Sequence, residues 1–131
     1  MRVLALDYGA ARTGLAVSDE TGTIASPLGV VERAASAAGI ERIRSIVERE
    51  RVEHVVVGLP LTLRGERGQQ ARETEAFVDA LRAAVAVPVE TYDERFTTSI
   101  AAQASGAAPE DARAAAHLLS SYLEWKNASR T

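Results

Sequence analysis

Residues 2–18, RVLALDYGAARTGLAVS, decide the fold of this chain. The run from Arg2 to Asp7 is apolar at both alternating positions, as expected of a central strand that other layers cover on both faces. A glycine-flanked turn then allows a second strand from Gly14 to Ser18, in which apolar and small residues alternate. The carboxylate of Asp7 therefore stands at the end of a buried strand, beside the backbone amides of the turn and the guanidinium of Arg12.

Composition limits the classes of protein that remain. The chain has 131 residues, of which 47% are hydrophobic, enough to bury one sizeable core. We therefore expect one globular domain over residues 1–131. The chain contains no cysteine, which excludes disulfides, thiolate metal sites and cysteine nucleophiles.

Hydropathy and charge indicate the environment of the protein. No apolar stretch approaches the roughly 20 residues of a membrane span, and the N-terminal run has the pattern of a strand and not of a signal peptide. We expect a cytoplasmic protein with no membrane partner. The net charge of -3 and the pI of about 5.4 argue against a generally cationic coat for nucleic acid, but they are compatible with a local basic rim.

The rest of the chain is typical of alternating strands and helices, without linkers or repeats. A hairpin turn at residues 19–22 leads to a third strand, in which Pro27 predicts a sheet edge or a break. A glycine-punctuated loop at residues 59–68 follows the fourth strand and is a predicted wall of a site. The predicted spans are 24–31, 54–58 and 87–92 for the later strands, and 36–51, 69–84, a short segment ending at 105, and 109–125 for the helices.

This order predicts an α/β fold: a mixed sheet of five strands, three antiparallel and then alternating with helices, with helices on both faces. Asp7 and the pair Asp93-Glu94 end strands at the carboxyl edge, where ligands bind in open α/β sheets. Asp111 lies in the first turn of the last helix, on the stripe expected to pack against the sheet. A carboxylate on that stripe can reach the same edge.

Carboxylates that converge at one edge would repel each other unless cations lie between them. A set of ligands made of oxygen atoms alone selects Mg²⁺ or Mn²⁺. Two such ions can orient an attacking water and stabilise the leaving oxygen of a phosphodiester, so that no histidine or cysteine is required. The carboxylate pattern therefore predicts metal-assisted hydrolysis of a nucleic acid.

Several blocks of sequence carry a resemblance to a known family. The blocks are Ala5-Leu6-Asp7-Tyr8-Gly9, Arg12-Thr13-Gly14-Leu15-Ala16, Gly58-Leu59-Pro60, Asp93-Glu94-Arg95-Phe96-Thr97-Thr98, and Asp111 with Leu119-Ser120-Ser121-Tyr122-Leu123. In this order and spacing they resemble the YqgF/RuvX family over essentially the whole chain. The resemblance implies an RNase H-like fold related to Holliday junction resolvases.

The resemblance also implies a function and roles for residues. The function is that of a nuclease in the maturation of the 5′ end of precursor 16S ribosomal RNA, with junction resolution as an older proposed role. The residues carried over by motif are, as catalytic carboxylates and metal ligands, Asp7, Glu94 and Asp111, with Asp93 as the catalytic neighbour of Glu94, and, as groups that face phosphate or hold the carboxylates, Arg12 and Arg95.

One segment departs from the family pattern. Where the family places basic residues just before the aspartate of the last helix, this chain has residues 106–110, GAAPE. Phosphate contacts would then come from elsewhere, and the candidate arginines are Arg64, Arg67, Arg72 and Arg113. Alternatively, a basic path forms only across a homodimer, for which the apolar end of the last helix, residues 122–125, is a predicted interface.

Other interpretations stand beside the nuclease. Asp7-Tyr8-Gly9 with Arg12-Thr13-Gly14 also resembles the first phosphate loop of actin-like ATPases and sugar kinases, but those folds need two lobes and a second phosphate loop. A non-catalytic RNA-binding or ribosome-assembly factor would use the same fold and fits the acidic balance. The expected partners are structured or single-stranded RNA, branched DNA and ribosomal precursor particles. Taken singly, the acidic residues would also fit a turn, a helix N-terminus and a surface ion pair.

Overall fold

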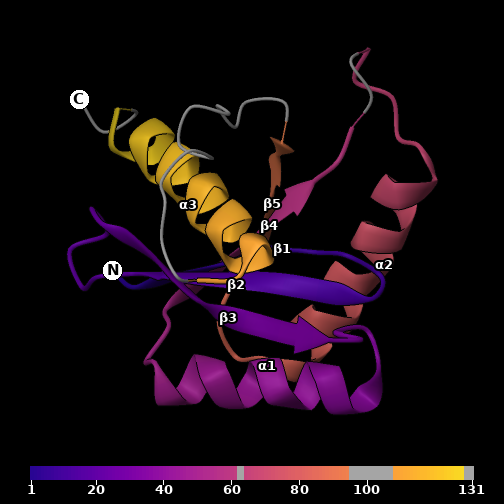
Figure 1. Cartoon of the computed structure of the whole chain (residues 1–131), viewed down its shortest axis with the longest axis horizontal. Helices are drawn as coiled ribbons and strands as arrows, with labels where there is room; N and C mark the ends of the chain where they lie inside the picture. The colour runs from indigo at the N-terminus through magenta and orange to yellow at the C-terminus, as the bar shows by residue number, and fades with distance from the viewer. Residues whose placement is uncertain (62–63, 95–107, 129–131) are drawn as a thin grey trace.

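A five-stranded mixed sheet forms the middle layer of the computed structural model, which describes residues 1–61, 64–94 and 108–128 (Figure 1). The strands are ordered β3-β2-β1-β4-β5 across the sheet. The elements, in chain order, are β1 (Val3–Asp7), β2 (Arg12–Ser18), β3 (Ala25–Glu32), α1 (Ala37–Arg49), β4 (His54–Leu59), α2 (Gln69–Ala84), β5 (Val89–Asp93) and α3 (Glu110–Ala128).

Strand β1 lies in the centre of the sheet. It pairs with β2 in the antiparallel direction, with Asp7 opposite Gly14, and with β4 in the parallel direction, with Leu6 opposite Val57. Residues 3–6 are buried on both faces, which is why the run is apolar at every position. The predicted central strand is therefore confirmed, and the parallel strands β1, β4 and β5 all end at the same edge of the sheet.

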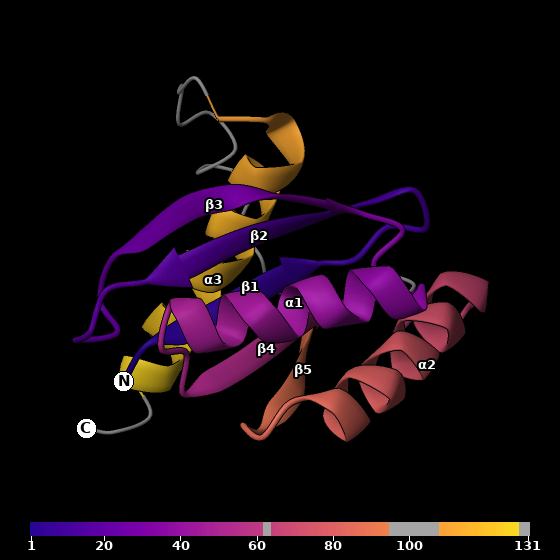
Figure 2. The same cartoon turned by 90° about the horizontal axis from the view of Figure 1, so that it is seen from below.

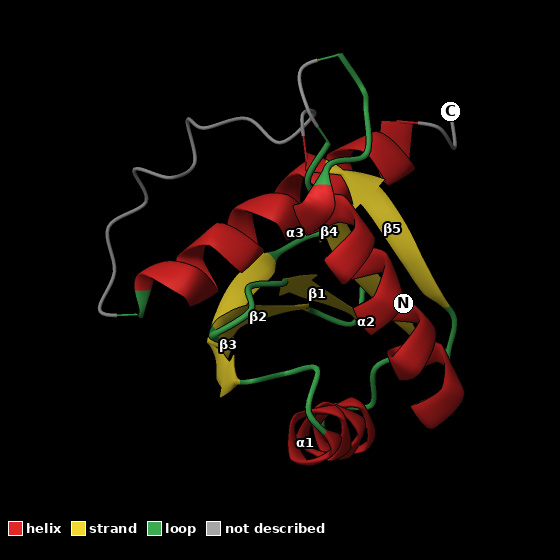
Figure 3. Ribbon diagram, turned by 90° about the vertical axis from the view of Figure 1, so that its right-hand side faces the viewer, coloured by secondary structure: helices red, strands yellow, loops and turns green. Residues whose placement is uncertain are grey.

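Two hydrophobic cores lie on the two faces of the sheet. Helices α1 and α2 cover one face (Figure 2), and Ile43 and Phe77 belong to the same buried cluster as Leu4 and Leu6 of β1. Helix α3 covers the other face (Figure 3), with its apolar residues packed against alternate positions of β1, β2, β4 and β5. Figures 1 and 3 thus confirm the prediction of helices on both faces. No helix in the described ranges is both long and apolar enough to span a bilayer.

The edge prediction for the third strand is confirmed. Strand β3 is an edge strand, and Pro27 lies beside a shift in register, where Gly29 pairs with Leu15 but Pro27 already pairs with Ala16. A proline is tolerated there because an edge strand has no further partner for its missing N–H group.

Several predicted boundaries move by two or three residues. Strand β2 begins at Arg12 and not at Gly14, because β3 continues to Glu32 and supplies a partner. Strand β5 begins at Val89, after a proline whose carbonyl already accepts a hydrogen bond from the Val55 N–H group. Helix α2 matches the predicted span, α1 is shorter, and α3 continues three residues further, to Ala128. The predicted short helix ending at residue 105 lies outside the described residues.

We predict that Leu119→Ala destabilises the protein by about 2–5 kcal/mol, because Leu119 is fully buried between α3 and the sheet and the change leaves a cavity. Denaturant-induced unfolding at a fixed pH measures the effect. The control is Glu124→Ala on the exposed side of the same helix, which should change the free energy of unfolding by no more than about 0.5 kcal/mol. Equal effects of the two changes would contradict the packing described above.

Candidate active site

Strand alternation places the side chains of Asp7 and Glu94 on the same face of the sheet. On β1, Val3 and Ala5 belong to the core beneath α3, so Asp7, two positions further, points to that face. On β5, Tyr92 belongs to the same core, and Glu94 follows it by two positions. The two carboxyl groups meet at the carboxyl edge and form a hydrogen bond.

Burial dominates the electrostatics of this pair. Desolvation raises the pKa of Glu94 to about 7, and the hydrogen bond to Asp7 and the charges of Asp7 and Asp93 add to the effect. Desolvation also raises the pKa of Asp7; the hydrogen bond from Glu94 counteracts it, and the charge of Asp111 adds to it. The hydrogen bond raises the pKa of Glu94 and lowers that of Asp7. The proton therefore belongs to Glu94, which donates the hydrogen bond to the carboxylate of Asp7.

Asp111 approaches the pair from α3. Its position is fixed by a close contact between backbones: a Cβ atom at Gly14 would lie 1.8 Å from the carbonyl oxygen of Asp111. Only glycine leaves room for the first turn of α3 on this part of β2. The carboxylate of Asp111 forms an ion pair with Arg12, with 3.3 Å between Nε and Oδ2. The carboxylate of Asp111 therefore lies near Asp7, but its partner is the guanidinium of Arg12.

The donor set is compatible with a hard divalent cation. Two half-buried carboxyl groups that share a proton are the arrangement expected where a cation would otherwise neutralise them, and all donors are oxygen atoms. Within residues 1–61, 64–94 and 108–128, however, no three acidic, histidine or cysteine side chains lie close enough together to form a metal site. Asp111 pairs with Arg12, and Asp7 and Glu94 meet without Asp111 as a third ligand.

The structure separates Asp93 from Glu94. Asp93 pairs in register with Leu59 and alternates with Tyr92, so its side chain points away from the face that carries Asp7. Its charge still acts on Glu94 and helps to raise the pKa of that carboxyl group. The sequence left open which of the two meets Asp7, and the geometry favours Glu94.

The predicted arginines occupy different environments. Arg64 lies in the exposed loop after β4, and Arg67 in the same loop forms an ion pair with Glu75, with 3.6 Å between Nε and Oε2. Arg72 is exposed on α2, whereas the Nε atom of Arg113 is buried and makes no hydrogen bond in the described part of the chain. Arg95 lies outside the described residues.

The aromatic residues near the edge are mostly engaged in packing. Tyr8 stacks on Phe77, with 4.5 Å between the ring centroids, and Tyr122 at the predicted interface is fully buried. Of the predicted interface at residues 122–125, Trp125 is the large apolar residue that is exposed, at 51%.

The sequence did not predict the roles of two residues beside this site, Gly14 and Thr13. It placed Gly14 at the start of the second strand but did not predict that the backbone of Asp111 would lie against it, opposite Asp7. It also gave no part to Thr13, whose buried hydroxyl lies within hydrogen-bond distance of both the N–H group and the carbonyl of Gly9 and so closes the turn after β1. The available signal was the glycine itself, because a glycine inside a strand often marks the close approach of another backbone.

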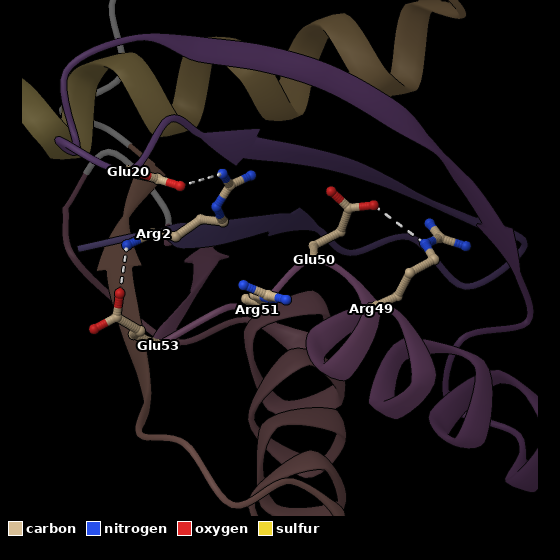
Figure 4. Close-up of a pocket in the computed structure, with 6 residues that line it drawn as sticks. All are labelled: Arg2, Glu20, Arg49, Glu50, Arg51 and Glu53. Atoms are coloured by element: carbon tan, nitrogen blue, oxygen red, sulfur yellow. Dashed lines mark hydrogen bonds and ion pairs between the residues drawn. The ribbon is translucent and has the colours of Figure 1, made fainter.

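A hollow lies away from the Asp7–Glu94 pair, at the amino ends of β1 and β4 (Figure 4). Its volume is about 450 Å³, and it is lined by Arg2, Glu20, Arg49, Glu50, Arg51 and Glu53. Arg2 pairs with Glu20 at 3.8 Å and Arg49 with Glu50 at 3.1 Å. Because arginines and glutamates balance here, this hollow attracts neither anions nor cations strongly, and the carboxyl edge is the better candidate for chemistry.

Comparison with known proteins agrees with the family resemblance of the sequence. Residues 1–125 match the family described as "RuvX: Holliday junction resolvase". The chain belongs to the RuvX family. A relative from Chloroflexus aurantiacus, named "Putative pre-16S rRNA nuclease", is 46% identical over 101 residues, which cover 77% of this chain and 66% of the relative. A relative of the same name from Desulforudis audaxviator is 46% identical over 76% of this chain and 70% of its own length.

The fold also has solved counterparts. The structure of T. thermophilus RuvC in complex with Holliday junction substrate superposes with a TM-score of 0.67 at 20% identity and covers 98% of this chain and 96% of that one. This likeness confirms the predicted RNase H-like fold of the RuvC type. Family and names together place the chain among nucleases, which are hydrolases that act on phosphodiester bonds. The alignments span about two thirds of the length of these relatives.

We predict that, without divalent cations, the thermal stability of the protein falls as the pH rises from the ordinary pKa of 4.5 to the raised pKa of about 7. In this range folded Glu94 keeps a proton that the unfolded chain has released, so each increase in pH favours unfolding. Thermal unfolding at a series of pH values measures this slope, and Glu94→Gln should reduce it. The exposed control Glu124→Gln should leave it unchanged; equal slopes in wild type and Glu94→Gln would show that Glu94 is not the group responsible.

Proposed function

We propose that this chain is a divalent-metal-dependent nuclease that acts in the 5′-end maturation of precursor 16S ribosomal RNA. The observation that carries the proposal is the half-buried pair Asp7–Glu94, two carboxyl groups held together at the carboxyl edge with a raised pKa for both. A structural role does not require two acids to lie in contact, whereas a cation bound between them would take the place of the proton and relieve their repulsion. The names of the relatives support the RNA substrate.

Asp7 and Glu94 would hold the cation, and Asp111 would complete the site from α3. A bound Mg²⁺ or Mn²⁺ ion would activate water and stabilise the charge that develops on the phosphate and the leaving oxygen. Asp93 acts on this site through its charge, from the other face of the sheet. The rigid central strand fixes Asp7, which gives the ligand set a defined position.

Arg12 would contact the phosphate backbone. Its side chain is 65% exposed, and its ion pair with Asp111 is of the exposed kind, which is worth no more than about 1 kcal/mol. A phosphate group can therefore replace Asp111 as the partner of Arg12, and Asp111 then becomes available to the cation. Substrate binding and completion of the metal site would be coupled through this one arginine.

Arg64, Arg67 and Arg95 are further candidates for phosphate contacts. Arg64 and Arg67 lie in the loop that follows β4, next to the carboxyl edge. Further elements of the proposal are a single domain over residues 1–131, a cytoplasmic location, a homodimer, and ribosomal precursor particles as partners. Branched DNA is a second candidate substrate, because the family is described as Holliday junction resolvase.

A non-catalytic RNA-binding or ribosome-assembly role is the alternative function. It is favoured by the pairing of Asp111 with Arg12, which leaves the described residues without three carboxylates at a metal-binding distance. The two functions differ in their response to loss of a carboxylate, since a binding factor does not need Asp7.

We predict that Asp7→Asn reduces cleavage at least about 1,000-fold and leaves folding intact, because it removes the charge that holds the cation but keeps the shape of the side chain. The assay uses end-labelled single-stranded RNA, precursor ribosomal RNA and a four-way DNA junction, each with Mg²⁺, Mn²⁺ or a chelator. In parallel, Mn²⁺ should raise the melting temperature of the wild type but not that of Asp7→Asn.

The matched control for this change is Asp79→Asn, the same substitution at an exposed position of α2, which should cleave like the wild type. Cleavage at the wild-type rate by Asp7→Asn would rule out the nuclease assignment. RNA binding without cutting, by wild type and Asp7→Asn alike, would establish the binding factor instead.

We predict that Arg12→Ala weakens binding of RNA. The magnitude of the negative slope of log K against log salt concentration should fall by about one, because one phosphate contact is lost. Binding titrations at several salt concentrations measure this slope. The control is Arg44→Ala: Arg44 also forms ion pairs, with Glu41 and Glu48, but lies on α1, beyond the opposite face of the sheet. An equal loss for both variants would mean that Arg12 contributes only general positive charge.

A further inference from the structure

Asp7 lies between two glycines of the neighbouring strands. On one side, Gly14 of β2 is its partner in the register. On the other side, Gly58 of β4 comes one position after Val57, the partner of Leu6. Gly58 shares its strand face with Val56, which packs in the core beneath α3, so Gly58 belongs to the face that carries Asp7 and Glu94.

The side chain of Glu94 fills the space that a side chain at position 58 would need. A Cβ atom built on Gly58 would lie 2.5 Å from Oε1 of Glu94, 2.9 Å from its Cγ and 3.0 Å from its Cδ. The first two distances are shorter than real Cβ contacts and the third is tighter than most of them, and all three are to atoms of one side chain. At Gly14, by contrast, the blocking atoms belong to the backbone of α3.

The backbone conformation gives no other reason for a glycine here. Gly58 does not have the positive φ angle that Gly22 and Gly65 show, so another residue could adopt its conformation. Glycine in the interior of a strand is unfavourable, because it packs no side chain and loses more entropy on folding. Its benefit must therefore come from the space it leaves, and Glu94 occupies that space.

We propose that Gly58 is a positioning residue, whose missing side chain lets Glu94 lie across the end of β4 and meet Asp7 to form a divalent cation site. This inference rests on the function proposed above and adds to it a residue that touches neither substrate nor cation. A methyl group at position 58 pushes the Glu94 carboxyl group away from Asp7. The flexible side chain of Glu94 absorbs the shift, and the sheet remains as it is.

The positioning role and a purely structural role predict effects in opposite directions. Alanine is normally better than glycine in a strand, so the melting temperature of Gly58→Ala should equal or exceed that of the wild type. Affinity for Mn²⁺ should nevertheless fall by about 10- to 100-fold, the usual cost of losing a group that orients a metal ligand. A structural role would lower the melting temperature and leave the affinity of the folded protein unchanged.

The experiment compares wild type, Gly58→Ala and Gly29→Ala. Gly29 lies in β3, and a Cβ atom there would meet nothing within 4 Å, which makes it the matched control. Mn²⁺ affinity is measured by electron paramagnetic resonance on the RNA-free protein, and stability by thermal unfolding. For RNA cleavage by Gly58→Ala we expect kcat to fall about 100-fold with KM unchanged, since the reacting geometry and not RNA binding is disturbed.

A double-mutant cycle with Glu94→Ala completes the test. If Gly58 acts through Glu94, the Gly58→Ala change has no further effect on Mn²⁺ affinity once the Glu94 side chain is absent. If the losses of Mn²⁺ affinity from Gly58→Ala and Glu94→Ala add in the double variant, the positioning role is overturned. The same holds if Gly58→Ala lowers the melting temperature in the Glu94→Ala background as well. Wild-type Mn²⁺ affinity in Gly58→Ala also overturns it, but leaves the nuclease assignment in place. If the wild type binds no Mn²⁺ and Asp7→Asn still cleaves normally, the proposed function itself fails.

Discussion

The hydrogen bond between Asp7 and Glu94 is the interaction on which the rest of the candidate site depends. Two carboxyl groups come together only if the surrounding structure compels them, because their mutual repulsion and the loss of water both disfavour the contact. The compulsion comes from the parallel strands β1, β4 and β5, which end at one edge. Burial of β1 on both faces prevents Asp7 from moving away, and the raised pKa of both groups is the electrostatic consequence.

Helix α3 supplies the third acidic residue because it is fixed at both of its ends. Near its N-terminus, Gly14 lets the backbone of Asp111 rest on β2. Near its C-terminus, Tyr122 donates a hydrogen bond to Glu90, which also contacts His54, with 2.7 Å between Nε2 and Oε1. Burial alone would raise the pKa of Glu90, but these two hydrogen bonds outweigh it, and the pKa of Glu90 is lowered. The core beneath α3 thus serves to set the position of Asp111.

Membership of the RuvX family supports the proposal that the carboxyl edge is the active site, and in that proposal the ion pair of Arg12 with Asp111 would be broken when substrate binds. Glu94 carries a proton and Asp111 pairs with Arg12, so the edge without a divalent cation keeps only part of the negative charge that three ionised carboxylates would give it. Under the proposed function, a nucleic acid would bring phosphate to Arg12, and a divalent ion would replace the proton between Asp7 and Glu94. Both exchanges would lead to the same arrangement of three carboxylates around a cation and would let an acidic protein bind a polyanion at this edge.

The sequence by itself determined the order of the elements and the residues that end at the edge. Apolar runs and helical spacing are local properties, so they predicted β1, α2 and the edge character of β3. The family motifs likewise selected Asp7, the pair Asp93-Glu94 and Asp111 from 18 acidic residues. The tertiary structure decided which carboxyl groups touch. Asp93 and Glu94 differ by one position, and only the packing of α3 on one face tells which side chain meets Asp7. Only the tertiary structure shows that the backbone of Asp111 lies against Gly14 and that Arg12 pairs with the carboxylate of Asp111. Both depend on contacts between segments about 100 residues apart, which no local pattern encodes.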